Sequence, residues 1–99
     1  MPAFRLAASI AAALAVLGAG APVLAATCAD KAVSARGDSS RFEVLAKAKA
    51  RGNWRAKVRA MPTLGAAYAD FSKATAPDYR CSETDGRHIC VAIAHPCRD

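Results

Sequence analysis

The feature that most constrains this chain is the dipeptide Asp85-Gly86, which has a cysteine at the same distance on either side. The dipeptide lies between two runs that suit strands, and Asp-Gly is typical of the two-residue type I′ turn of a β-hairpin. With these two residues as the loop, Cys81 lies directly opposite Cys90. The pair falls at a non-hydrogen-bonded position, where Cα atoms are closely spaced and a disulfide fits. The sequence therefore predicts a disulfide-clasped hairpin within residues 78–97.

The first 26 residues have the three parts of a secretory signal peptide. Arg5 provides the positive charge, residues 6–17 form the apolar core, and Val23-Leu24-Ala25 is a small-residue cleavage site. The apolar core is shorter than the roughly 20 residues that span a bilayer. We therefore expect a signal peptide over residues 1–25, export to the periplasm or the medium, and no transmembrane segment in the processed chain.

Removal of this leader leaves about 74 residues, which are too few for a large hydrophobic core. In small exported domains, cysteines usually supply the missing stability as disulfides. Four cysteines allow three pairings, but a hairpin that joins Cys81 to Cys90 leaves Cys28 to pair with Cys97. This second crosslink would close nearly the whole mature chain into one loop.

Residues 26–39 are small and polar, and we interpret them as an N-terminal arm. The arm allows one helical turn over residues 30–35 and ends in the turn signal Arg36-Gly37-Asp38. The next four residues, from Ser40 to Glu43, have the pattern of a capping box, which predicts a helix that begins at Arg41.

Two apolar stripes along this predicted helix are offset by more than about 100°. The first stripe comprises Phe42, Leu45 and Ala46, and the second comprises Trp54, Val58 and Met61. The offset falls at Gly52-Asn53, whose residue types suit a helix end followed by a new N-cap. The sequence therefore predicts two helices, over residues 41–51 and 54–61, or one kinked helix.

A third helix is predicted over residues 64–74, where Thr63 can serve as the cap and apolar residues recur at helical spacing. The expected fold is α+β. Two or three short helices pack on a C-terminal, two-stranded antiparallel β-hairpin, and the two disulfides stabilise one small domain over residues 40–99.

The predicted hairpin has two faces, and the sequence leaves open which of them the helices cover. One face is small and carries the two hairpin cysteines, Tyr79, Ala92 and Ala94. The other carries Ile89, Val91 and Ile93, whose burial is favoured by transfer energy. We favour the small face inward, because aromatic rings would then pack closely over the disulfide. The three large residues would then form an exposed apolar stripe, which is typical of a partner surface.

Three residue patterns lie between Gly52 and Cys97: Trp54-x-x-x-Val58, Gly65-x-x-Tyr68-x-x-Phe71-x-x-Ala74, and Cys90-x-Ala92-x-Ala94-x-Pro96-Cys97. With these spacings the chain resembles a group of small exported four-cysteine proteins of alphaproteobacteria, known as hypothetical proteins. The resemblance implies a bacterial cell-envelope setting and the order of helices followed by a hairpin. It implies no activity.

Positive charge is concentrated in the predicted helical segment. Residues 41–59 include seven basic side chains and one acid, whereas the full chain has 14 basic and 8 acidic residues. A localised charge of this size attracts polyanions, and arginine can bind a phosphate through two hydrogen bonds. An ordinary solvated helix face is the alternative, because the charges spread around the helical wheel. The candidate anion-binding residues are Lys47, Lys49, Arg51, Arg55, Lys57 and Arg59.

No catalytic constellation is recognisable in the sequence. His88 faces Glu83 across the predicted hairpin, but no nucleophile lies beside them, and such pairs commonly stabilise sheets. His88 and His95 each lie two residues before a cysteine, yet the sequence lacks the Cys-x-x-Cys knuckle of zinc sites. We therefore expect no enzymatic activity, no metal and no cofactor.

These observations favour a non-enzymatic exported protein of the cell envelope, acting as an accessory or binding module. Its basic helical surface would bind anionic polymers or lipid head groups, and the Ile89, Val91 and Ile93 stripe would bind a protein. Nucleic acid is not an expected partner. The alternative is a secreted cationic effector of the antimicrobial type, in which the same charge acts on membranes.

Overall fold

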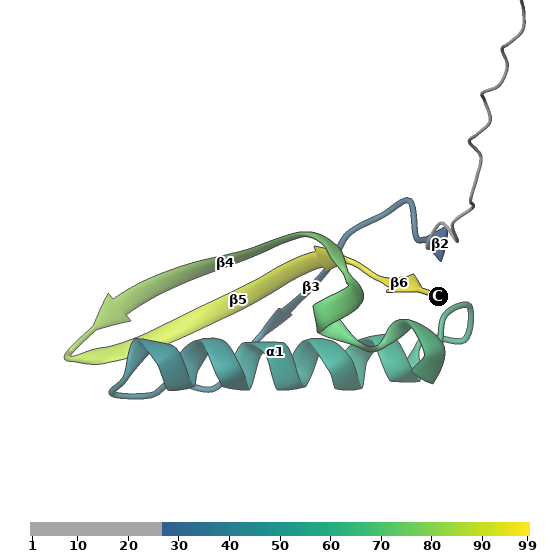
Figure 1. Cartoon of the computed structure of the whole chain (residues 1–99). Coiled ribbons are helices and arrows are strands. Elements are labelled where there is room, and N and C mark those ends of the chain that lie inside the picture. Colours follow the sequence, from purple (N-terminus) through teal and green to yellow (C-terminus); the bar gives the residue numbers. More distant parts are fainter. Residues whose placement is uncertain (1–26) are drawn as a thin grey trace, which may run out of the picture.

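A single helix lies along one face of a small antiparallel sheet in the computed structural model, which describes residues 27–99 (Figure 1). The helix is α1 (Glu43–Ala60), and the sheet has the order β3-β5-β4. Its strands are β3 (Val33–Arg36), β4 (Thr75–Thr84) and β5 (Arg87–His95). A two-stranded ribbon of β2 (Thr27–Cys28) and β6 (Cys97–Arg98) lies at the end of the molecule away from the hairpin turn. The predicted signal peptide lies outside the described residues.

The β4–β5 hairpin has the predicted register. Asp85 and Gly86 form its loop with φ angles of 54° and 75°, and a type I′ turn requires positive φ at both positions. Cys81 pairs with Cys90 across the two strands. The Cys90 carbonyl accepts from the Gly37 amide of the arm at 2.9 Å, so Cys90 directs its hydrogen-bonding groups away from β4. The cysteine pair is therefore non-hydrogen-bonded toward β4, as predicted.

Both predicted disulfides are present. Cys81 is bonded to Cys90, and Cys28 is bonded to Cys97. The second bond lies between β2 and β6, which pair antiparallel with these two cysteines in register. It joins residues 69 positions apart, so it links the start of the described chain to its end.

The predicted helical turn over residues 30–35 is wrong, because the arm contributes strand β3. Val33 and Ala35 are buried and Ser34 and Arg36 are exposed, which is the period-two alternation of a strand covered on one face. β3 pairs antiparallel with β5 along its whole length. The sheet therefore has a third strand beyond the predicted hairpin.

The predicted break at Gly52-Asn53 is also wrong, because α1 is one continuous helix. Its buried side is a single row at four-residue spacing: Ala46, Ala50, Trp54 and Val58. Phe42 and Leu45, which were expected to share a core-facing stripe with Ala46, are exposed. With only one stripe to bury, the helix needs no change of direction at Gly52.

The predicted capping box does not form. Ser40 pairs with His88 in an isolated bridge, with hydrogen bonds of 2.6 and 2.9 Å between their backbones. The Ser40 hydroxyl accepts from the Phe42 amide at 3.3 Å, and α1 begins at Glu43 rather than Arg41. Ser40 thus anchors the arm to the hairpin instead of capping the helix.

Two short 3₁₀ turns replace the predicted third helix: η3 (Ala66–Tyr68) and η4 (Phe71–Lys73). Gly65 precedes them with a φ of 78°, outside the helical region. The Asp70 carboxylate accepts from the Ser72 amide at 3.0 Å, a local bond that competes with helix continuation. These turns direct Phe71 onto the edge of Trp54, with ring centroids 5.0 Å apart.

The sheet buries its small face, as favoured from the sequence. Cys90, Ala92 and Ala94 of β5 are fully buried beneath α1, as is Trp54 of the helix. The indole Nε1 of Trp54 donates to the Val33 carbonyl at 2.9 Å. A Cβ atom at Gly37 would lie 2.4 Å from the Ala50 nitrogen, so the helix and the arm touch backbone to backbone at this point. The α+β class is therefore confirmed, with one α-helix and more strands than predicted.

Candidate binding surfaces

One flank of α1 is held against β3 and the residues that follow it by three side chains at successive turns. Lys49 Nζ donates to the Ser39 carbonyl at 3.2 Å and Lys57 Nζ donates to the Ser34 carbonyl at 2.7 Å. Between them, Asn53 Nδ2 donates to the Arg36 carbonyl at 2.8 Å. The bonds to Arg36 and Ser34 satisfy outward carbonyl groups of this edge strand. Lys49 and Lys57, two of the six candidate anion-binding residues, thus also join the helix to the arm.

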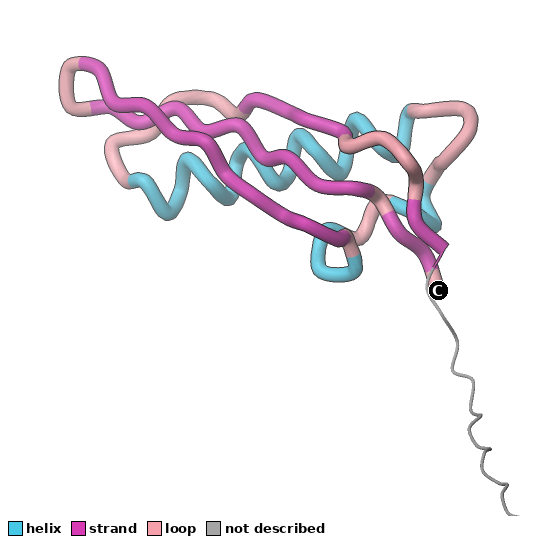
Figure 2. The backbone as a smooth tube through the Cα atoms, turned by 90° about the horizontal axis from the view of Figure 1, so that it is seen from above, coloured by secondary structure: helices cyan, strands magenta, loops and turns pink. Residues whose placement is uncertain are grey.

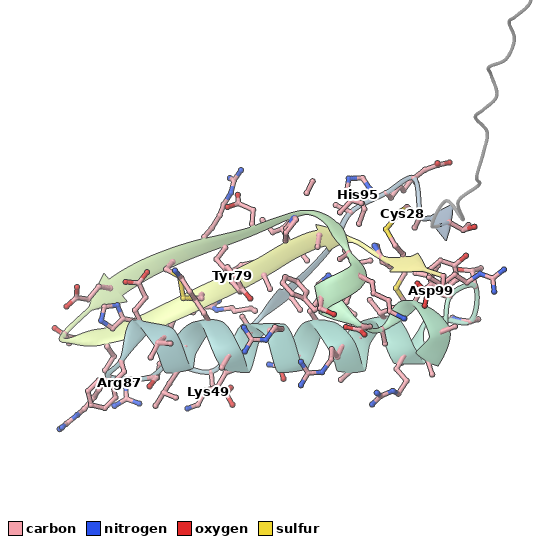
Figure 3. All side chains as sticks on the ribbon, viewed as in Figure 1. Cys28, Lys49, Tyr79, Arg87, His95 and Asp99 are labelled. Carbon is pink, nitrogen blue, oxygen red and sulfur yellow. A yellow bond between two sulfur atoms is a disulfide. The ribbon has the colours of Figure 1, made fainter. Side chains whose placement is uncertain are left out.

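The opposite flank of α1 places two further candidates against Tyr79 of β4, which is labelled in Figure 3. Arg51 Nη1 lies 3.0 Å from the Tyr79 hydroxyl and donates to it. Lys47 Nζ lies 5.6 Å from the centre of the Tyr79 ring and 3.5 Å from a Glu43 carboxylate oxygen. Both cations therefore have contacts within the chain.

Arg55 and Arg59 differ from the other four candidates. They lie one turn apart and are exposed, and neither has a hydrogen-bond or ion-pair partner among residues 27–99. Arg55 is close to Asp70: hydrogen bonds from Ser72 hold the pKa of that carboxyl below its ordinary value, and the charges of Lys73 and Arg55 add to this lowering. This pair of guanidinium groups is the part of the predicted basic surface that is free to contact a ligand.

The face of the sheet opposite α1 carries a second cationic feature, which the sequence analysis missed. Arg36 of β3 and Arg80 of β4 both pair with Val91 of β5, so the three residues form one row across the sheet. Side chains on one row point to the same face. In Figure 2 the helix runs beneath the strands and leaves this face toward the viewer. We call it the open face.

A shallow groove of about 260 Å³ lies on the open face. Its lining residues are Arg36, Arg80, Cys81, Ser82, Ile89 and Val91. The predicted partner stripe of Ile89, Val91 and Ile93 lies on this face, but all three residues are half-buried rather than exposed. Arg36 was missed because Arg36-Gly37-Asp38 was interpreted as a turn, although the alternation of residues 33–36 indicated a strand.

The largest exposed apolar side chains lie near the start of α1. Phe42, Val44 and Leu45 have exposed fractions of 61%, 72% and 49%, and the neighbouring Arg41 is also exposed. This end of α1 lies beside the hairpin turn, where Arg87 is labelled in Figure 3. The Arg87 guanidinium donates to the hydroxyl and carbonyl oxygens of Ser39.

The residues considered for catalysis or metal binding are placed as follows. His88 faces Glu83 in the hairpin register, and His95 Nδ1 lies 3.0 Å from the Ala29 carbonyl oxygen at the other end of the molecule. All four cysteines are in disulfides. Within residues 27–99, no three His, Cys, Asp or Glu residues gather closely enough to hold a metal ion. No helix in this part of the chain has the length and apolar character needed to cross a membrane.

Comparison with known proteins adds no family to these surfaces. No protein-family model, curated protein or solved structure matches the chain. Function is therefore inferred from the contacts, charge and exposure of the residues themselves.

Proposed function

We propose that this protein is a non-enzymatic exported protein of the cell envelope that binds anionic polymers or lipid head groups through the outer face of α1. The observation that carries the proposal is the Arg55 and Arg59 pair, two exposed cations without a hydrogen-bond or ion-pair partner among residues 27–99. The two disulfides support export, because such bonds persist in oxidising compartments.

The spacing of the pair suits a repeating anion. Residues four apart on a helix have Cβ atoms about 6 Å apart, so both guanidinium groups can reach neighbouring phosphates or sulfates. Arginine binds such groups through two parallel hydrogen bonds. Because the pair is exposed to solvent, its attraction for a polyanion should weaken as salt is added.

Heparin affinity tests this function. The double variant Arg55→Gln/Arg59→Gln should bind heparin about five- to tenfold more weakly than the unaltered protein, since it loses two exposed charge contacts. The matched control is Lys49→Gln/Lys57→Gln, which removes the same charge from side chains that donate to backbone carbonyls. Thermal unfolding should accompany both measurements, because the control also removes two contacts between α1 and the arm.

Two results would contradict this proposal. Equal weakening by the two double variants would mean that overall charge, rather than the Arg55 and Arg59 pair, attracts the polyanion. Binding that does not change with salt would mean that charge does not drive it.

A secreted cationic effector that acts on membranes is the second candidate function. It is favoured by the exposed cluster of Phe42, Val44 and Leu45 beside Arg41, because apolar side chains next to cations insert into anionic membrane surfaces. Leakage of dye from anionic vesicles, lost in the Phe42→Ser/Leu45→Ser variant, would support this function. Vesicle binding without leakage would exclude it and leave the envelope-binding function in place.

A further inference from the structure

The open face of the sheet combines charge and aliphatic surface in a regular order. Along β5, Ile89, Val91 and Ile93 share this face and form an apolar line. Arg36 and Arg80 lie on either side of that line at its midpoint, Val91. Ser82 lies opposite Ile89, and Ser34 lies opposite Ile93, so each side of the line also carries a hydroxyl.

We infer that the open face binds one molecule of an anionic lipid-like amphiphile. Its phosphate lies over Val91 between Arg36 and Arg80, and its aliphatic chain runs from there over Ile89, the other large aliphatic residue that lines the groove. This site lies on the opposite side of the sheet from α1, so it is separate from the Arg55 and Arg59 pair.

The two arginines are spaced to hold a single anion between them. They are separated by one intervening strand, which places their Cα atoms about 10 Å apart. Two long side chains can converge over that distance on one phosphate. Arg36 has no side-chain hydrogen bond or ion pair within residues 27–99. Arg80 Nε lies 3.8 Å from Asp78, at the limit of an ion pair, and both side chains are more than 60% exposed, so a phosphate can replace this contact.

The apolar line is too narrow for a protein partner. Stable protein interfaces bury about 800 Å² on each partner. Ile89, Val91 and Ile93 are already half-buried, so their remaining exposed surface supplies only a small part of that area. The face of a sheet also offers no free backbone groups, because these point along the sheet plane. An aliphatic chain requires no hydrogen bonds, so the half-buried surface of this line suits it.

A second copy of the chain is a poorer occupant for the same surface. If two open faces packed together, each copy would bring its Arg36 and Arg80, so four arginines would meet at one interface. Among the β4 residues that pair with Ile89, Val91 and Ile93, the acid is Asp78, opposite Ile93. Four cations against two acids favour an anionic ligand over self-association.

Binding of dodecyl phosphate, below the concentration at which it forms micelles, tests the inference. In amide NMR spectra of the oxidised Arg55→Gln/Arg59→Gln variant, which lacks the exposed cation pair of α1, this probe should shift the signals of residues 89–93. Inorganic phosphate lacks the chain and dodecyl maltoside lacks the charge, so each should bind at least about tenfold more weakly, because the chain and the charge contribute separately.

Two variants separate the contributions of charge and chain. Arg36→Gln/Arg80→Gln should weaken dodecyl phosphate binding about tenfold, through the loss of two charged contacts. Ile89→Thr keeps both arginines and the strand and lies one row away from the phosphate, so it should weaken binding of dodecyl phosphate but not of inorganic phosphate. The matched control is Lys31→Gln/Arg98→Gln, which removes the same charge near the β2–β6 ribbon and should leave the affinity within about twofold.

Three results would overturn the inference: shifts confined to α1, equal affinity for dodecyl phosphate and inorganic phosphate, or no loss of affinity in Arg36→Gln/Arg80→Gln. If an acidic amphipathic peptide shifts residues 89–93 and dodecyl phosphate does not, a protein occupies the face instead. Heparin binding by Arg55 and Arg59 is measured separately and does not depend on Arg36 or Arg80, so each proposal can fail while the other holds.

Discussion

The two faces of the sheet differ in the size of their side chains, in the direction opposite to that expected from hydrophobicity alone. The buried face is built from small residues, including Cys90, Ala92 and Ala94, whereas the open face carries the larger Ile89, Val91 and Ile93. The bulk of the core comes instead from Trp54 of α1. The comparison shows that close fit against the helix decides which face is buried.

This arrangement leaves branched aliphatic side chains where solvent and ligands can reach them. Burying them against α1 would remove more apolar surface from water, but it would require space that Trp54 and the close approach of Ala50 to Gly37 already occupy. The open face therefore carries apolar surface that the fold itself does not use. The following variants test whether the two faces differ energetically as they differ structurally.

The largest difference in stability should come from truncating one large side chain in the buried layer and one on the open face. Trp54→Ala removes a fully buried ring and should lower the free energy of unfolding by about 3–5 kcal/mol. Ile93→Ala on the open face should lower it by only about 1–2 kcal/mol, because Ile93 is already half in solvent. Urea unfolding of the oxidised proteins measures both. Trp54→Phe, which keeps a ring but loses the bond to the Val33 carbonyl, should fall between them.

If Ile93→Ala cost as much as Trp54→Ala, the open face would contribute to the core, and the contrast between the faces would fail.

Adding a methyl group at either of two glycines should give smaller changes in stability, and the two changes should have opposite signs. Gly37→Ala would place a Cβ atom 2.4 Å from the Ala50 backbone and should destabilise the protein by about 1–3 kcal/mol. Gly52→Ala on α1 meets nothing closer than an Arg55 nitrogen at 3.9 Å. It should stabilise the helix by up to about 1 kcal/mol, because alanine has the higher helix propensity. Thermal unfolding of both variants measures the difference, and destabilisation by Gly52→Ala would contradict the continuous helix.

The smallest effect concerns acid stability at the border of the buried layer, where Asp70 begins the turn that directs Phe71 onto Trp54. The hydrogen bond from the Ser72 side chain lowers the pKa of Asp70 first, followed by the Ser72 backbone bond and nearby cations. Because the pKa is lower in the folded state than in the unfolded state, the ionised carboxylate stabilises the fold above its unfolded pKa. This contribution is lost as the pH falls through the folded pKa.

Ser72→Ala should therefore move the pKa of Asp70 upward, toward its ordinary value, in an NMR titration of the carboxyl carbon. Asp70→Asn should show a shallower loss of stability in acid than the unaltered protein. An unchanged Asp70 titration in Ser72→Ala would mean that the side-chain bond is not the leading cause of the lowered pKa.

The hairpin and its crosslink were predictable because they follow from short-range rules. The turn residues Asp85-Gly86 determine the register, and the register determines the cysteine pairing. The helix break and the third helix were mispredicted because both depended on assuming that every apolar stripe faces the core. Phe42 and Leu45 are exposed, and Asp70 bonds locally instead of continuing a helix.

The candidate sites were predictable only in part, for a related reason. The candidate basic residues were visible in the sequence and lie on α1, but the number of free cations depends on β3, a four-residue strand whose carbonyls accept from Lys57 and Asn53. Because this strand was interpreted as a turn, the sequence predicted neither those bonds nor the pairing of Arg36 with Val91 on the open face.

The bonds from Asn53 and Lys57 to β3 also limit how this sheet can grow. They occupy the outward carbonyls of Arg36 and Ser34, so a further strand cannot dock at that side. Polymerisation into a fibril through continued strand pairing requires two open sides on every molecule. With β3 closed by the helix, pairing through β4 would stop at two molecules.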